Sequence, residues 1–160
     1  MSASDPEARV QEYAAIEQID VDTAHPLGYG QDGVVWKTSR SSAVKALERS
    51  ETYFRELGCY QLLKAKGIHN LEGFAIPRLV KFHSELLIIE MDIVHPPFVV
   101  DFGKSHLSKP DYSEEAIQEW YNEHEEMWGD NWDNVWRLVR ALRAKGIYYM
   151  DPNPRNIRLE

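Results

Sequence analysis

The chain has 160 residues, of which 43% are hydrophobic and 11% aromatic, and its formal net charge is −8. This length suits one domain or two small lobes, and the apolar content excludes a wholly disordered chain. The negative net charge excludes the tracking of a nucleic-acid backbone as the main task, because phosphates are bound by clustered lysine and arginine.

The sequence carries no sign of secretion, of a membrane span or of a metal-ligand motif. Cys59 is the only cysteine, so no disulfide can form within the chain. The N-terminus lacks the basic and apolar stretches of a signal peptide, and the longest apolar runs, such as 86–89, are too short to cross a bilayer. The six histidines are scattered. We therefore expect a cytoplasmic protein with no membrane or nucleic-acid partner.

The first half of the chain predicts a glycine-rich turn followed by a hairpin. Residues 1–20 are polar and acidic and predict only a loosely attached helix. A glycine-punctuated turn over 27–33 precedes the β-branched and aromatic residues 34–38, which predict a strand. A turn then leads to a second strand over 43–47.

A helix is predicted next, with Ser50 as its N-cap residue. Tyr53, Leu57 and Tyr60 recur at intervals of four and three residues and form one apolar stripe. Gly67 closes the helix, because glycine readily adopts the left-handed conformation at helix ends. The helix therefore has one face suited to packing on a sheet.

Two strands and then two helices complete the pattern. Strands are predicted over 78–83 and 85–94, and the continuous apolar run in the second indicates burial on both faces. Ser113 caps a helix that runs to about Trp128. The stripe of the following helix comprises Trp132, Val135, Trp136, Val139 and Leu142. A short strand at 147–149 leads to a loop. The order predicts an α+β fold with two segregated lobes.

The glycine loop is the first candidate for a binding site. Gly28, Gly30, Gly33 and Val35 form the pattern G-x-G-x-x-G-x-V. Glycine has no β-carbon, so backbone N–H groups in such a loop can approach phosphate oxygens. The loop lies between strands and does not open a helix, which argues against a dinucleotide-binding fold. Taken alone, the pattern is better explained as a plain glycine-rich hairpin.

A lysine and three acidic or amide residues add chemistry to this loop. Lys45 lies in the middle of a strand and needs an anion if it is buried, and Glu56 on the next helix offers one. Asp151 can accept the proton of an attacking hydroxyl, and Asn156 can bind Mg²⁺, in a loop stiffened by proline. The simpler alternatives are a solvated lysine and glutamate, and a turn held by local backbone bonds.

Together, in this order, the segments LGYGQDGVV, AVKAL and GIYYMDPNPRN resemble the protein-kinase-like superfamily over residues 25–160. The resemblance implies an antiparallel ATP-binding lobe with one helix over 25–94, a shortened helical lobe over 95–160, and an extension over 1–24. It also implies ATP and Mg²⁺ as cofactors, with catalytic Asp151, Lys45 and Glu56, and Asn156 on the metal. The implied nucleotide contacts are Gly28, Gly30, Gly33, Val35, Ala43, Lys45, Ile89, Glu90 and Asp92.

Three departures from the family pattern bear on activity. Tyr149 and Met150 stand where the family has His-Arg, so control through a phosphorylated activation loop is not expected. The chain ends soon after Asn156, which predicts a shortened lower lobe without the later Asp-Phe-Gly. An Asp101-Phe102-Gly103 triplet does occur, but it precedes the catalytic loop. From this order we expect the triplet to lie outside the site; the alternative is that Asp101 serves as a metal ligand.

Two functions remain open. The first is a phosphotransferase that moves the γ-phosphate of ATP to an unknown hydroxyl-bearing acceptor. The second is a catalytically inactive, pseudokinase-like module that binds nucleotide or protein. A shortened lower lobe would expose apolar surface, so a second copy of the chain or a protein partner is expected to cover it. The acidic, tryptophan-rich stretch 113–136 is either a partner surface or, as we favour, a solvated helix face whose tryptophans pack inward.

Overall fold

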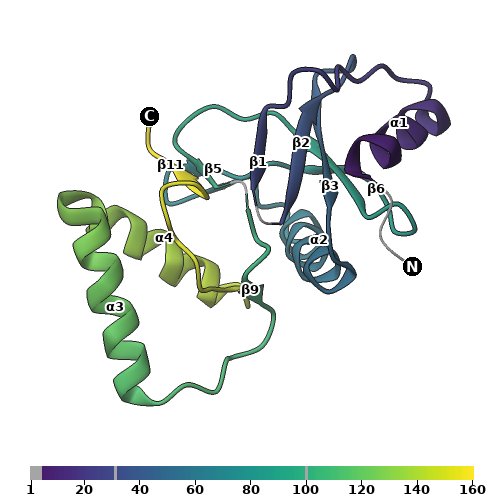
Figure 1. Ribbon diagram of the computed structural model, residues 1–160. Helices are drawn as coiled ribbons and strands as arrows, with labels where there is room; N and C mark the ends of the chain where they lie inside the picture. Colours follow the sequence, from purple (N-terminus) through teal and green to yellow (C-terminus); the bar gives the residue numbers. More distant parts are fainter. Residues whose placement is uncertain (1–4, 31, 100) are drawn as a thin grey trace.

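The computed structural model describes residues 5–30, 32–99 and 101–160. Its N-terminal half is a five-stranded antiparallel sheet flanked by helices, and its C-terminal half is mainly helical (Figure 1). The sheet order is β1 (Gly28–Gly30), β2 (Gly33–Lys37), β3 (Ser42–Leu47), β7 (Ile88–Asp92) and β6 (Leu79–His83). The predicted α+β class is confirmed.

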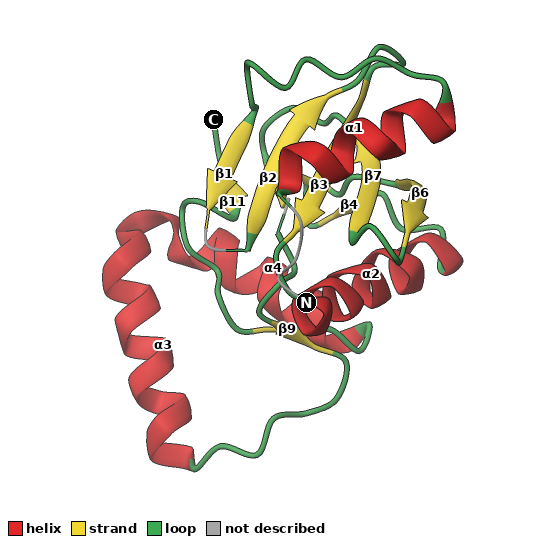
Figure 2. Ribbon diagram, turned by 45° about the vertical axis from the view of Figure 1, so that its right-hand side comes forward, coloured by secondary structure: helices red, strands yellow, loops and turns green. Residues whose placement is uncertain are grey.

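Both faces of the central strand β3 are covered, because a helix packs on each side. Side chains alternate along a strand. Val44 and Ala46 pack against α1 (Pro6–Glu17), whereas Ala43 and Leu47 pack in the core that contains α2 (Ser50–Ala65). Lys45 shares the second face. Figure 2 shows α1 lying across the sheet.

The N-terminal helix is a packed element, so the prediction of loose attachment is wrong. Val10 and Tyr13 of α1 are fully buried against the sheet. The hydroxyl of Tyr13 donates a 2.7 Å hydrogen bond to Glu90 Oε2 in β7. Most of the residues around these two are polar, which is why the sequence alone suggested a weakly held segment.

The α2 helix confirms its predicted stripe but not its predicted cap. Tyr53, Leu57 and Tyr60 are all buried. The helix begins at Ser50 itself, and Arg49 precedes it without a side-chain capping bond, so the prediction of Ser50 as N-cap is wrong. Gly67 has φ +68°, the left-handed conformation expected after a helix end.

The apolar strand β7 is shorter than predicted. Leu87 has φ +53°, and its backbone N–H donates to the carbonyl of Ser84 at 3.3 Å, so residues 84–87 form a turn before the strand. Burial on both faces is confirmed within the strand itself, where Ile88 and Ile89 point to opposite sides and are both fully buried.

Several very short strands join the two halves, and most of them were not predicted. β4 (Asn70–Leu71), β5 (Phe74–Ala75), β8 (Phe98–Val99) and β11 (Ile157–Arg158) form a second sheet in the order β11-β8-β5-β4. β9 (Ser105–His106) pairs with β10 (Tyr148–Tyr149), and only β10 was predicted. Two-residue strands show no periodicity in a sequence, so their pairing is visible only in three dimensions.

The C-terminal helices confirm their predicted bounds. The Ser113 hydroxyl accepts a 3.1 Å bond from the backbone of Ala116 at the start of α3 (Glu114–Trp128). A 3₁₀ turn, η1 (Gly129–Asn131), separates α3 from α4 (Trp132–Ala144). The rings of Trp120, Trp132 and Trp136 contact one another between the helices, which confirms inward packing of tryptophans in this stretch.

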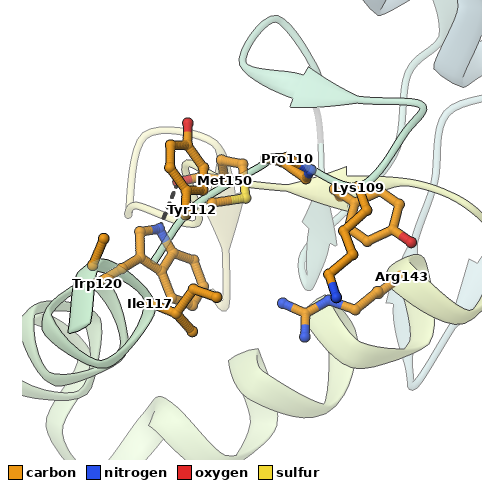
Figure 3. A pocket seen from close by; sticks show the side chains of 9 residues that line it. Lys109, Pro110, Tyr112, Ile117, Trp120, Arg143 and Met150 are labelled. Atoms are coloured by element: carbon orange, nitrogen blue, oxygen red, sulfur yellow. Dashed lines mark hydrogen bonds between the residues drawn. The ribbon is translucent and has the colours of Figure 1, made fainter. Parts of the chain in front are cut away.

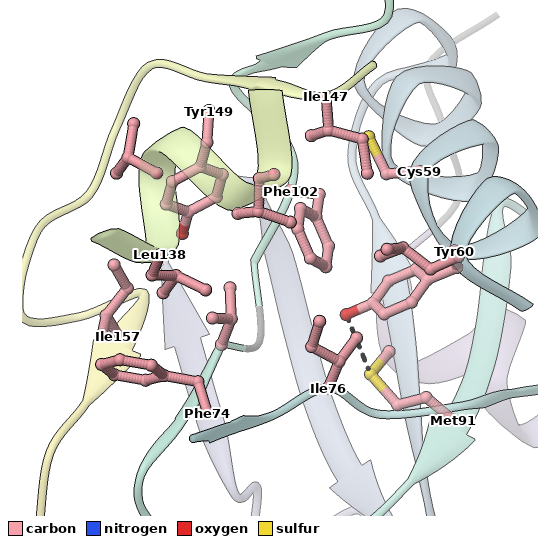
Figure 4. Close-up of a cluster of buried hydrophobic side chains, with 14 of the residues drawn as sticks. Cys59, Tyr60, Phe74, Ile76, Met91, Phe102, Leu138, Ile147, Tyr149 and Ile157 are labelled. Carbon is pink, nitrogen blue, oxygen red and sulfur yellow. Dashed lines mark hydrogen bonds between the residues drawn. The ribbon is translucent and has the colours of Figure 1, made fainter. Parts of the chain in front are cut away.

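One hydrophobic core extends from α2 to α4. Tyr60 of α2 packs edge-on against Phe102, whose ring also contacts Tyr149, and Leu138 of α4 lies in the same cluster (Figure 4). All four side chains are buried. The two halves are therefore joined by shared packing. Within the described residues, no helix has the length and apolar character needed to cross a membrane.

Candidate active site

A buried ion pair links the sheet to α2. Lys45 on β3 and Glu56 on α2 are 4% and 0% exposed, and Lys45 Nζ donates to both Glu56 carboxylate oxygens at 2.9 Å. The helix stripe packs α2 on the same sheet face that carries Lys45, so the two side chains meet. The structure brings these two predicted residues together, and the alternative of a solvated lysine and glutamate is wrong.

Acidic side chains outnumber the single ammonium group of Lys45 in its immediate surroundings. Burial lowers the pKa of Lys45, but the carboxylates of Glu56 and Asp101 raise it more, so its pKa lies above the usual lysine value. Burial raises the pKa of Glu56 to about 7 against the opposing Lys45 ammonium, and the charges of Asp101 and Asp32 add to the rise. Lys45 therefore stays charged in an acidic neighbourhood.

Two segments of the chain run antiparallel and are paired at both ends. The upstream arm runs from Phe98 to His106 and the downstream arm from Tyr148 to Arg158. β8 pairs with β11 at one end, and β9 pairs with β10 at the other. The turn that begins at Asp101 and the loop that begins at Asp151 lie between these two ladders. The pairing therefore places the two loops opposite each other.

Asp101 lies in the site, so the expectation that its triplet falls outside is wrong. Its Oδ2 atom is 3.4 Å from Lys45 Nζ, and its Oδ1 atom accepts a 2.8 Å bond from the backbone of Gly103. A β-carbon at Gly103 would lie 3.2 Å from Oδ2 of Asp32, which belongs to the glycine loop. The glycine loop, Lys45 and Asp101 therefore converge. The expectation failed because it was based on chain order, whereas pairing of the arms decides position.

The Asp151 carboxylate is held by neighbours on both of its oxygens. Asn153 Nδ2 donates to Oδ1 at 2.7 Å, and Asn156 Nδ2 donates to Oδ2 at 3.2 Å and to the backbone carbonyl of Asp151 at 2.8 Å. Lys104 Nζ, from the upstream arm, lies 3.3 Å from Oδ2. Local bonds therefore fix the predicted Asp–Asn loop, and a cation from the opposite arm faces it.

Tyr149 packs the two arms together from inside. Its ring is 5.7 Å from that of Phe102, between ring centroids, and its side chain is buried. Burial raises the pKa of Tyr149 well above its usual value, and the nearby charges of Asp101 and Asp151 raise it further. The charges of both carboxylates therefore act on the pKa of the same buried phenol, as expected if their loops face each other.

The three loop glycines have different surroundings. A β-carbon at Gly33 would lie 2.3 Å from the backbone oxygen of Ala46, so close packing of β2 on β3 requires glycine there. No atom lies within 4 Å of a β-carbon built at Gly28 or Gly30, so their outer side is open. Of the other predicted nucleotide contacts, Val35 and Ala43 lie on β2 and β3 and pack against the main core.

The predicted adenine contacts lie on β7. Ile89 is buried in the core opposite Lys45. Glu90 lies on β7, which pairs with β3 and β6, and its buried carboxylate binds Arg40, Ser42 and Tyr13 on the α1 side. The adenine contact expected of its backbone stays a prediction. Asp92 ends the strand, and its backbone N–H donates to the backbone carbonyl of Arg78 at 3.0 Å.

The residues present fit a magnesium ion that arrives with a nucleotide. Among the described residues, no three His, Cys, Asp or Glu side chains gather as a metal site on their own. Mg²⁺ is typically held by one or two protein ligands together with phosphate oxygens and water. Asn156 uses its amide nitrogen toward Asp151, which leaves its amide oxygen for a cation. Asp101 supplies a carboxylate from the facing arm.

Sequence reasoning found Lys45, Glu56, Asp151 and Asn156 but missed the roles of others in the site. Asp32 was read only as part of the glycine loop, although an acidic residue in a loop proposed to hold phosphate is itself unusual. Lys104 follows directly after the Asp101 triplet, and only the pairing of the arms places it beside Asp151.

No family model and no curated protein matches the chain. A solved structure described as the streptomycin-ATP-APH(2")-IIa ternary complex matches 81% of this chain, with 17% sequence identity and a TM-score of 0.41. The chain spans 41% of that structure's own length.

Proposed function

We propose that the protein binds ATP with Mg²⁺ and transfers the γ-phosphoryl group to a hydroxyl-bearing acceptor. The observation that carries the proposal is the convergence of the glycine loop, Glu56 and the Asp101 turn on the buried ammonium of Lys45, with the Asp151 loop opposite the Asp101 turn on the facing arm. A phosphotransferase needs little covalent chemistry from the protein and relies on positioning and charge.

Lys45 is the phosphate-binding residue in this proposal. Its ammonium is held by Glu56 and points toward Asp101, so it is oriented before a nucleotide arrives. The open side of Gly28 and Gly30 leaves room for the phosphates to approach the loop backbone. The preorganised ammonium then needs no rearrangement to meet an anion.

The excess of carboxylates explains why a divalent cation is needed. Glu56, Asp101 and Asp32 all raise the pKa of Lys45 by their negative charge, so a bare triphosphate would meet net repulsion. Mg²⁺ bound by Asp101 and Asn156 would neutralise this charge and supply Lewis-acid polarisation of the phosphoryl oxygens. Nucleotide affinity is therefore expected to depend strongly on Mg²⁺.

In this proposal, Asp151 accepts the proton of the acceptor hydroxyl. Its carboxylate is fixed by Asn153 and Asn156, which limits the geometries from which an alcohol can approach. Lys104, 3.3 Å away, would stabilise negative charge that develops on the transferred group. The identity of the acceptor depends on contacts beyond these residues.

Thermal unfolding with ATP, with and without Mg²⁺, tests the binding half of the proposal. The unfolding temperature of the wild type should rise with MgATP, because a ligand that binds only the folded state stabilises it. Lys45→Met should abolish the rise. Lys37→Met is the matched control, since Lys37 is an exposed lysine on the neighbouring strand β2, and should keep it. If Lys45→Met does not fold, Asp101→Asn should lose the Mg²⁺-dependent part of the shift.

ATP turnover tests the catalytic half. Wild-type protein should release phosphate or phosphorylate an added alcohol, and Asp151→Asn should reduce the rate by about 10²-fold or more. Asp133→Asn, at an exposed position of α4, should not change it. MgATP binding with equal background turnover in the wild type and Asp151→Asn would contradict catalysis and support a nucleotide-binding module instead. No stabilisation by any nucleotide would contradict the whole proposal.

A further inference from the structure

A pocket of about 420 Å³ lies beside the Asp151 loop, and its lining includes none of the residues assigned to the proposed ATP site. It is formed by the segment that leads from β9 to α3, by α3 itself, by the end of α4 and by Tyr148 and Met150 of the downstream arm (Figure 3). This volume falls in the range of small-molecule sites, which run from roughly 300 to 1,000 Å³.

Most of the pocket wall is apolar. Trp120 and Ile117 of α3 form one side, and Tyr112 and Met150 contribute above them in Figure 3. The indole nitrogen of Trp120 already donates a 2.9 Å bond to the carbonyl of Met150, so the ring is fixed in place with its polar atom satisfied. Ile117 and Tyr112 are about half exposed, as side chains facing an open pocket would be. This wall suits the hydrocarbon body of a ligand.

Two cations line the same pocket without an acidic partner. Lys109 comes from the segment before α3 and Arg143 from the end of α4, and their charged ends converge at one side of the pocket in Figure 3. The chain has 26 acidic and 18 basic residues, and yet neither side chain forms an ion pair with any described residue. Arg143 is oriented instead by the Trp136 ring, 5.6 Å from its Cζ atom, which leaves its N–H donors available.

We propose that this pocket binds a small amphipathic organic anion. The acidic group of the ligand would lie between Lys109 and Arg143, and its aromatic or aliphatic body would pack against Trp120 and Ile117. Two converging cations repel each other, and an anion between them relieves that repulsion while forming charge-assisted hydrogen bonds. The proposal does not depend on nucleotide binding, because none of these residues takes part in the ATP site proposed above.

Fluorescence titration with two matched dyes tests the charge requirement. Anilinonaphthalene sulfonate carries one sulfonate, and phenylnaphthylamine has the same ring system without it. The wild type should bind the sulfonate at least about tenfold more tightly, as expected for one charge-assisted interaction in a partly enclosed site. Equal affinity for the two dyes would overturn the proposal.

Substitutions then locate the site. Arg143→Gln and Lys109→Gln should each weaken sulfonate binding by about tenfold and leave phenylnaphthylamine binding unchanged. Arg140→Gln is the matched control, because Arg140 is exposed on the same helix and does not line the pocket. A loss in Arg140→Gln equal to that in Arg143→Gln would mean general surface attraction and would overturn the assignment. Cooperative thermal unfolding of each variant checks that the dye titrations were made on folded protein.

Competition separates two kinds of acidic group. Octanoate and octyl phosphate share one hydrocarbon chain and differ in the head that would meet Lys109 and Arg143. Displacement of the sulfonate dye by either anion supports the proposal, and the more effective competitor identifies the acidic group that the pocket prefers. Failure of both, with displacement by neutral octanol, would show that the pocket selects apolar molecules only and would overturn the role given to the two cations.

Discussion

Glu56 has no exposed surface, and it shares the ammonium of Lys45 with Asp101. Such a carboxylate is costly to ionise, and its pKa is raised by burial from 4.5 to about 7. The folded protein therefore retains a proton on Glu56 at pH values where the unfolded chain has released it. Stabilisation from this proton is present at low pH and is lost as pH rises through the folded pKa.

The free energy of unfolding is accordingly expected to fall between pH 4.5 and about 7 because of this group. Urea unfolding at a series of pH values measures the effect, with Glu56→Gln as the comparison, because an amide has the same shape and does not titrate. The wild-type slope against pH should be more negative than that of Glu56→Gln over this interval. Parallel slopes for the two proteins would contradict a raised pKa at Glu56.

Gly33 illustrates a glycine that is required by packing. A methyl group there would enter the space of the Ala46 carbonyl, at 2.3 Å, so β2 and β3 would have to separate. Gly33→Ala should lower the free energy of unfolding by about 1–3 kcal/mol, the usual cost of overpacking. Gly28→Ala is the control from the same loop, since no atom lies within 4 Å of its β-carbon. Equal losses in chemical denaturation would contradict this distinction.

At the scale of elements, α1 is part of the sheet's packing. Val10 is fully buried in the cluster formed with β3 and β7. Val10→Ala should therefore destabilise the protein by about 2 kcal/mol, from lost burial and the cavity that remains. Glu12→Ala, at an exposed position of the same helix, should change stability by less than about 0.5 kcal/mol. Urea unfolding of both variants checks the prediction, and similar stability of the two would mean that α1 is loosely attached after all.

The elements that sequence reasoning predicted are those with a local signal. The stripe of α2 and the apolar residues of α4 repeat at helical spacing, and the hairpin of β2 and β3 is marked by turn residues. The two-residue strands lack such a signal, because each exists only through a partner elsewhere in the chain. The attachment of α1 was missed for a related reason: Val10 and Tyr13 are its only large buried apolar side chains, and the sequence does not show which surface covers them.

At the scale of the whole molecule, the site was predictable only where its residues are close in sequence. Lys45 and Glu56 belong to consecutive elements, and the helix stripe that packs α2 on the sheet also brings them together. The loops of Asp101 and Asp151 face each other because their arms pair over a long separation. Chain order suggested that the Asp101 triplet was misplaced, but antiparallel pairing makes position independent of which arm comes first.

The two ladders that hold the arms also determine when the Asp101 and Asp151 loops can face each other during folding. Pairing Val99 with Ile157 and Ser105 with Tyr149 closes loops of about fifty residues, which carries an entropic cost that the local hairpin β2–β3 does not have. The sheet and its lysine can therefore form early, whereas the opposing carboxylates meet only after residues 157–158 have been synthesised and docked. A nascent chain is therefore expected to complete the sheet before its two carboxylate loops come to face each other.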